Sequence, residues 1–175
     1  TPKIKLIVKE PELFIHNKKL KLEPVEFSFY RYFLERAKKK EGEIILDGLI
    51  NLKEYTKEAA GNIPTVVFEE ILNLYEESFK NEIGNWPAAV KYNKIVESNI
   101  NDNLKGEKKN KVTPTINNFK DTIYSINIKI KKFIEESDPY MEEEYLDMLL
   151  IKIKKDHYKI NLASDYISIK LPNSK

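Results

Sequence analysis

Hydrophobic and polar positions alternate over residues 3–22. The apolar side chains fall in three short runs, which are Ile4, Leu6 and Val8, then Leu13 and Ile15, then Leu20 and Leu22. A period of two is typical of strands that bury one face. A tight reversal near Asn17 and Lys18 would separate the last two runs. The pattern predicts a small antiparallel sheet of two or three strands.

The period becomes helical from Pro24, which suits a first helical turn, and Glu26 favours the helix dipole. The apolar stripe consists of Phe27, Tyr30, Phe33 or Leu34, and Ala37. The polar side consists of Arg31, Glu35 and Lys38. We therefore predict a helix that turns one face to the core and ends in a lysine run before Gly42.

The middle of the chain predicts further helices and a loop. Residues 43–59 favour a short helix, and Pro64 starts a stronger one. Its expected apolar face is Val67, Ile71, Leu74 and Ser78 or Phe79, with glutamates opposite. Residues 101–111 are polar without an apolar period and predict a solvated loop.

Residues 119–136 predict an amphipathic helix. Its apolar stripe is Phe119, Ile123, Ile126, Ile130 and Phe133 or Ile134. The polar stripe is Lys120, Tyr124, Asn127 and Lys131, flanked by Ser125, Lys129 and Lys132. Asparagine can read adenine, lysine can reach phosphate, and tyrosine can stack or bond a phosphate. The stripe is therefore a candidate nucleic-acid face, and a solvated or protein-binding face is the alternative.

A hairpin is expected over residues 148–163, where two alternating runs hinge near Lys155 and Asp156. Its apolar positions are Leu150, Ile151 and Ile153, answered by Tyr158, Ile160 and Leu162. Phosphate contacts could come from Lys152, Lys154, Lys155 and Lys159. Exposed strands also carry lysine to prevent edge-to-edge pairing, which is the alternative for these residues. Residues 164–175 predict a short strand or a tail.

Charge is distributed unevenly over the 175 residues, although the net charge is only +2. Residues 41–82 hold three lysines and ten acidic residues (3 − 10 = −7), whereas residues 105–132 hold eight lysines and two acidic residues (8 − 2 = +6). This asymmetry indicates an anionic partner for the later segment. Arginine occurs only at Arg31 and Arg36, which argues against guanine-reading sequence recognition.

Several classes of chemistry are disfavoured by the residues present. There is no cysteine, and His16 and His157 lie far apart, so we expect no metal site and no cofactor. No residue constellation points to catalysis. The absence of a long apolar run predicts no membrane span, and a cytoplasmic location is the expectation. Because the chain begins with Thr1 and turns at once into a strand, we expect a fragment of a longer protein.

Two stretches carry a resemblance to a known family. The run LFIHNKKLKLEPVEFSFYRYFLERAKK (13–39) resembles the entry to an OmpR-type winged helix. It is closer to the winged-helix domain behind the CARF domain of CRISPR-associated ring nucleases. IYSINIKIKKFI (123–134), a wing, and YKINLASDYISI (158–169) are similar to the end of that domain. The resemblance implies antiviral signalling through cyclic oligoadenylates. It transfers no catalytic residue, because a CARF domain with a Gly-rich turn is missing here.

These observations predict an α+β winged helix-turn-helix with a small N-terminal sheet and a C-terminal wing hairpin. The core would span about 1–54 and 113–175, with a helical insertion over about 55–112. The expected role is non-catalytic, either binding DNA or RNA or scaffolding a homodimer of the full-length CARF protein. One alternative is the DNA-binding output domain of an OmpR-type regulator. Another is a protein-interaction module in which the acidic segment over 41–82 meets a basic partner or the basic segment of a second copy.

Overall fold

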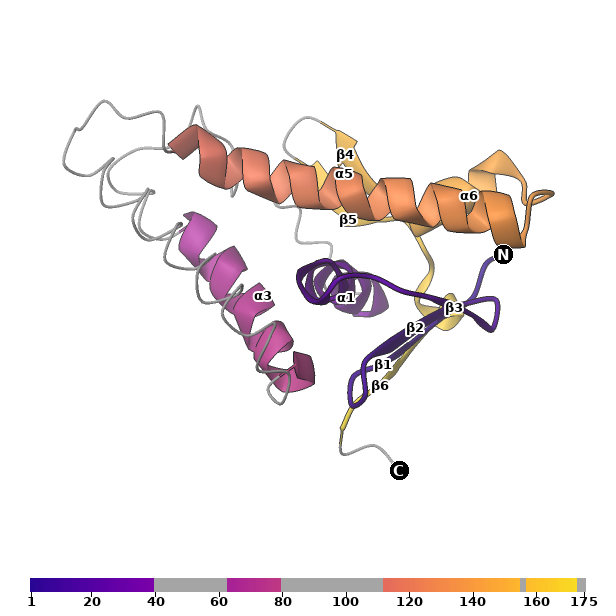
Figure 1. Ribbon diagram of the computed structural model, residues 1–175, viewed down its shortest axis with the longest axis horizontal. Coiled ribbons are helices and arrows are strands. Elements are labelled where there is room, and N and C mark those ends of the chain that lie inside the picture. The colour runs from indigo at the N-terminus through magenta and orange to yellow at the C-terminus, as the bar shows by residue number, and fades with distance from the viewer. Residues whose placement is uncertain (40–62, 80–111, 155–156, 173–175) are drawn as a thin grey trace.

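Four strands from both ends of the chain form one sheet in a computed structural model that describes residues 1–39, 63–79, 112–154 and 157–172 (Figure 1). Its order is β3-β2-β1-β6. The strands are β1 (Ile4–Ile7), β2 (Glu12–Ile15), β3 (Lys18–Leu20) and β6 (Ile167–Lys170). The first three pair antiparallel, as predicted. The alternation did not predict that β6 adds to β1 in parallel.

The reversal between β2 and β3 lies one residue earlier than predicted. Ile15 pairs with Lys18, so His16 and Asn17 form a two-residue loop with φ values of 49° and 65°. Two positive φ angles define the type I′ turn, whose twist matches that of the flanking strands. Asn17 tolerates this conformation well, because its short polar side chain is compatible with the left-handed region.

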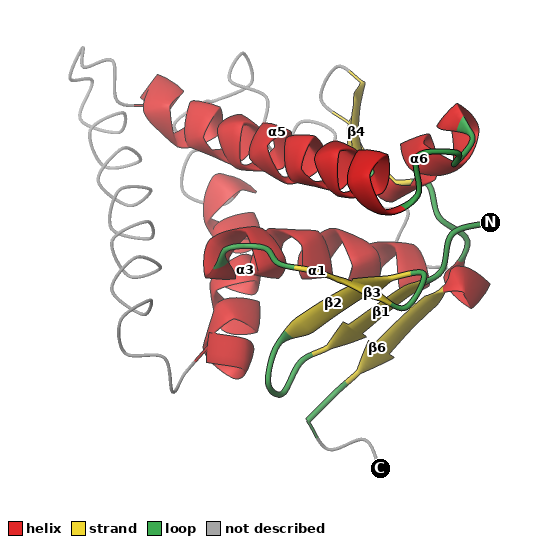
Figure 2. Cartoon of the chain, turned by 45° about the vertical axis from the view of Figure 1, so that its right-hand side comes forward, coloured by secondary structure: helices red, strands yellow, loops and turns green. Residues whose placement is uncertain are grey.

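Helix α1 (Pro24–Lys38) lies between the sheet, α3 (Ile63–Phe79) and α5 (Val112–Ser137) (Figures 1 and 2). Its beginning agrees with the prediction, because the Glu26 carboxylate accepts a hydrogen bond from the Glu23 N–H at 2.9 Å. All residues from 26 to 34 are buried. The expectation that Arg31 faces outward was therefore wrong, and only 2% of this residue is exposed. Helices and strands pack around α1 over residues 26–34, so this part of the helix has no polar side that faces solvent.

Helix α3 packs on α1 through Ile71, Tyr75 and Phe79, which are buried. The rings of Phe27 and Phe79 meet edge to face, with centroids 5.6 Å apart. This part of the predicted insertion therefore contributes to the core. The side chain of Val67 lies outside the described residues. The same holds for the helix expected over 43–59 and the loop expected over 101–111.

The short helix α6 (Glu143–Leu149) separates α5 from the hairpin of β4 (Ile151–Lys154) and β5 (His157–Ile160). No helix was predicted between the helix over 119–136 and the hairpin. The hairpin itself is confirmed, with Ile151 opposite Ile160 and Ile153 opposite Tyr158. After β5 the chain forms the 3-10 turn η3 (Ser164–Tyr166) and enters β6.

A buried hydrogen bond joins α1 to the end of α6. The Tyr30 hydroxyl donates to the Leu149 carbonyl at 2.7 Å, and burial raises the pKa of Tyr30 far above its ordinary range. The phenol therefore stays protonated and remains a donor. The result is a mixed α+β fold. Among the described helices, none has the length and apolar character needed to cross a membrane.

Candidate nucleic-acid interface

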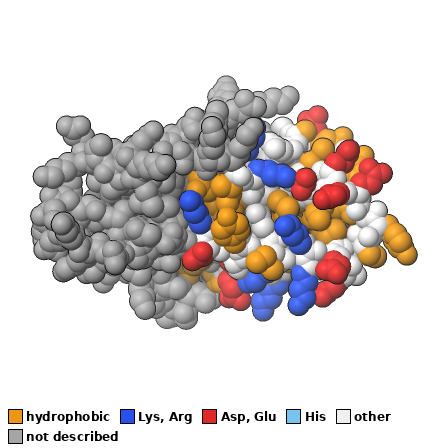
Figure 3. All heavy atoms as spheres, turned by 90° about the horizontal axis from the view of Figure 1, so that it is seen from above, with side chains coloured by type: hydrophobic (Ala, Val, Ile, Leu, Met, Phe, Trp, Pro, Cys, Tyr) orange, Lys and Arg blue, Asp and Glu red, His pale blue; other side chains and the backbone are white. Residues whose placement is uncertain are grey.

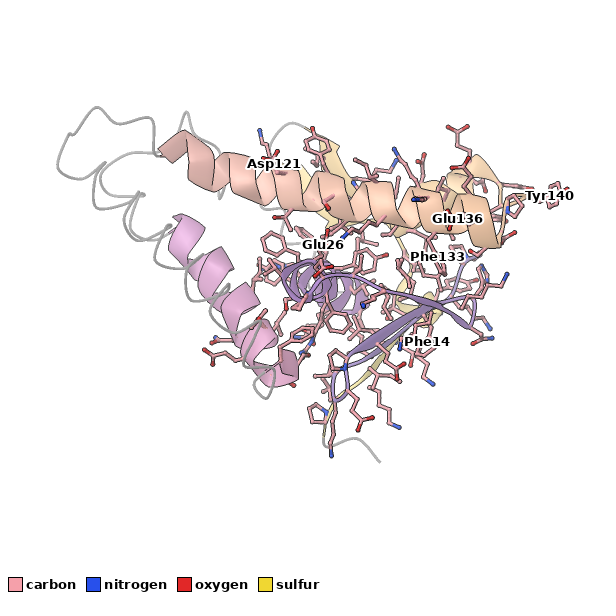
Figure 4. All side chains as sticks on the ribbon, viewed as in Figure 1. Phe14, Glu26, Asp121, Phe133, Glu136 and Tyr140 are labelled. Atoms are coloured by element: carbon pink, nitrogen blue, oxygen red, sulfur yellow. The ribbon has the colours of Figure 1, made fainter. Side chains whose placement is uncertain are left out.

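One flank of the polar stripe on α5 faces α1 rather than solvent. The Glu26 carboxylate, which lies between the two helices (Figure 4), accepts hydrogen bonds from Ser125 Oγ at 2.5 Å and Lys129 Nζ at 2.6 Å. Burial raises the pKa of Glu26, but the hydrogen bonds from Lys129, Ser125 and the Glu23 N–H, with the positive charge of Lys129, bring that pKa below its ordinary value. Ser125 and Lys129 therefore hold α5 in place.

Asn127 was predicted to read a base, but it binds the hairpin. Its Nδ2 donates to the Ile151 carbonyl, and its Oδ1 accepts from the Ile151 N–H, both at 2.9 Å. The amide thus occupies both backbone groups of the first residue of β4, as a neighbouring strand would. Because the same donor and acceptor would be needed for adenine, Asn127 is not free to read one.

The outward face of α5 is formed by Tyr124, Ile128, Lys131 and Lys132, by Lys120 at its edge, and by the acidic neighbours Asp121, Glu135 and Glu136. Tyr124 is 55% exposed and Ile128 64% exposed, and both lysines are exposed. Lys120, one turn before Tyr124, is half-buried. At about 100° per residue, Ile128 lies about 40° from Tyr124. This spacing could have placed Ile128 on the outward face, although the sequence analysis did not include it.

Both signs of charge occur on this outward face. Its three lysines, Lys120, Lys131 and Lys132, are matched by Asp121, Glu135 and Glu136, so the local sum is 3 − 3 = 0. The space-filling view of this side shows basic, acidic and hydrophobic side chains interspersed over the described part of the chain (Figure 3). Any electrostatic attraction of a nucleic acid here comes from local lysine pairs rather than from a broad positive field.

The hairpin lysines differ in their exposure and in whether an acidic residue pairs with them. Lys152 is partly exposed and pairs with Asp147 at 3.2 Å, whereas Lys159, opposite it in register, is exposed. Lys154 is the last residue of β4, but its side chain lies outside the described part, as does all of Lys155. The hairpin therefore places Lys152 and Lys159 side by side, and an ion pair partly neutralises Lys152.

Both arginines of the chain are engaged between α1 and α3. Arg31 pairs with Glu77 at 3.1 Å and with Glu35 at 3.3 Å, and Arg36 pairs with Glu70 at 3.5 Å. The polar side of α3, expected to be a solvated glutamate face, thus supplies partners to α1. With both arginines held in this way, bidentate guanine recognition has no residue of its usual type available.

No group of three or more histidine, aspartate and glutamate side chains that could hold a metal ion occurs within the described ranges. A comparison of the chain with protein-family models, curated proteins and solved structures found no match.

Proposed function

We propose that this chain is a non-catalytic binding module that contacts nucleic acid along the outward face of α5. The observation that carries the proposal is the exposed Tyr124, with Lys131 and Lys132 two turns further along the same helix. Tyrosine can stack on a base or donate to a phosphate, and lysine binds phosphate as a point charge.

The anchoring of α5 supports this proposal. Glu26 holds one flank of the helix through Ser125 and Lys129, and Asn127 holds another through Ile151. A helix fixed at both flanks presents its outward side chains in a defined geometry, which lowers the entropy lost on binding. With no free arginine and with Asn127 engaged, binding is expected to be largely independent of sequence.

The resemblance supplies a biological setting for the proposal. We propose first that the chain is a winged-helix-like domain of a CRISPR-associated CARF protein that acts in cyclic-oligoadenylate antiviral signalling. The output domain of an OmpR-type regulator is the alternative. The intervening α6 argues against a wing that follows the recognition helix directly, as in the simplest form of this fold.

Fluorescence anisotropy with labelled duplex DNA, single-stranded DNA and RNA, each at two salt concentrations, tests the proposal. Lys131→Gln/Lys132→Gln should weaken binding and lower the salt slope by roughly one to two units. The matched control is Lys38→Gln/Lys39→Gln, which removes an adjacent exposed pair at the end of α1. Equal losses in the two double variants, or no binding at low salt, would contradict a nucleic-acid face on α5.

A homodimer scaffold is the second candidate, favoured by the exposure of Ile128 beside Tyr124. An antiparallel pair of α5 helices centred near residue 126 would set Tyr124 against Ile128 and Asp121 against Lys131 of the second copy. Such a face is self-complementary, as a twofold interface requires. Light scattering should then show a dimer that Ile128→Lys converts to a monomer. A monomer at every concentration would remove this candidate.

A further inference from the structure

The outer face of the four-stranded sheet carries a row of side chains to which no role has been assigned above. Lys19, Phe14, Lys5 and Ser168 lie next to one another in register across β3, β2, β1 and β6. Their neighbours along the strands, such as Leu6 and Leu13, are fully buried, so alternation turns the row away from α1. Among the described elements, none lies in front of this face (Figure 2).

This face has a clear excess of positive charge. Among the strand residues of this face, Lys5, Lys19 and Lys170 are exposed and Glu12 is acidic, which gives 3 − 1 = +2. Glu12 pairs with Lys19 at 2.8 Å. The outward face of α5 sums to zero, so the sheet face carries the larger net positive charge, which suits a polyanion.

We propose that the outer face of the sheet binds single-stranded nucleic acid, with one base stacked on Phe14 and adjacent phosphates held by Lys5 and Lys19. The inference rests on the proposed function only in taking nucleic acid as the ligand. It uses a different surface, far from the outward face of α5 (Figure 4). Neighbouring strands are about 4.8 Å apart, so the two lysines flank the ring at about 10 Å from each other.

The ring of Phe14 is accessible to a polar group. Lys5 Nζ lies over it, 5.9 Å from the centroid, and Phe14 is only partly buried. A cation–π contact at an exposed site is weak. The Lys5 ammonium can therefore move to a phosphate when a base takes its place over the ring.

The geometry selects unpaired bases over a duplex. The π faces of a base are covered by its neighbours in a duplex, whereas single strands can splay their bases onto an aromatic ring. A broad sheet face does not enter the major groove, which accepts a helix or a two-stranded ribbon. Stacking tolerates every base, so little sequence preference is expected.

The test measures anisotropy of labelled oligo-dT and oligo-U, with a duplex of equal length, on the full chain. Phe14→Leu should weaken single-strand binding by about 5- to 100-fold, the range for losing one stacked base. Phe14→Tyr should restore it, because the ring is kept. Photo-crosslinking of an iodouracil oligonucleotide to the unaltered protein should label the peptide that contains Phe14, which avoids any effect of a substitution on folding.

The outcomes separate this inference from the proposed function. Loss of single-strand binding in Phe14→Leu but not in Lys131→Gln/Lys132→Gln supports the sheet site and shows that the α5 face does not bind single strands. The reverse pattern overturns the sheet site and leaves the α5 face standing. Three other results would also overturn the sheet site. They are a crosslink to another peptide, equal affinity of Phe14→Leu and the unaltered protein for single strands, and displacement of the bound oligonucleotide by polyglutamate as readily as by oligo-dT.

Discussion

Helices α1 and α5 pack against each other, yet their polar residues have opposite environments. On α1, Glu26 and Arg31 are buried and paired, with 7% and 2% exposure. On α5, Tyr124 and Lys131 face solvent. The difference arises from the number of faces that are covered, because α1 lies between the sheet, α3 and α5 (Figure 1). Polar side chains of α1 therefore hold the fold together, whereas those on the outward face of α5 remain available for binding.

Removing Arg31 should have the largest effect on stability. Arg31→Ala leaves Glu35 and Glu77 without their cation and creates a cavity, so we expect a loss of about 3 kcal/mol in the free energy of unfolding. Urea denaturation measures this loss. Arg31→Met also removes the cation but fills most of the space, so it should cost less than Arg31→Ala by the contribution of the cavity. Equal losses in both variants would show that the lost charge, rather than packing, sets the role of Arg31.

Removing the Asn127 amide should have the next largest effect. Asn127→Ala leaves the N–H and carbonyl of Ile151 without partners, and we expect a loss of about 2 kcal/mol. The control is Ile128→Ala, one residue further on α5. It replaces an exposed side chain and should change stability by less than about 0.5 kcal/mol. Thermal unfolding compares the two variants, and similar shifts would remove the distinction between the inner and outward sides of α5.

The Glu26 contact should have the smallest effect, and it depends on pH. Glu26→Gln is expected to cost about 1 kcal/mol at pH 7, through weaker hydrogen bonds with Ser125 and Lys129. The folded pKa of Glu26 lies below its ordinary value of 4.5. Its charge therefore stabilises the fold above pH 4.5, and this contribution is lost as the pH falls through the folded pKa.

Urea unfolding of the unaltered protein and of Glu26→Gln between pH 7 and pH 3 checks this dependence of stability on pH. The stability difference between the unaltered protein and Glu26→Gln should shrink below about pH 4.5. Lys129→Gln should produce a similar loss at pH 7, because it removes the same ion pair from the other side. A difference that stays constant over the whole pH range would contradict the ionised state of Glu26.

Local patterns predicted those elements that depend on residues close in sequence. The alternation over 3–22 and 148–163 gave the β1–β3 strands and the β4–β5 hairpin, because period two is a property of the strand itself. Pro24 and Glu26 correctly marked the start of α1. The same patterns did not reveal α6, whose seven residues are too few to set up a clear helical period.

Contacts between distant residues decided the roles within the candidate site. Ser125 and Glu26 are 99 positions apart, and Arg31 and Glu77 are 46 apart, so no local period could have paired them. Asn127 matches the residue type that reads adenine, and only its contact with Ile151 shows that it is occupied. The row of Lys5, Phe14 and Lys19 likewise depends on strand register.

The sequence by itself determined where most strands and helices form and which faces are apolar, because these follow from short-range periodicity. Tertiary structure decided that β6 joins β1, that α1 is covered on several sides, and which lysines are free. The physical reason is that a polar side chain is stable either in water or against a partner, and only the packed fold brings partners into reach.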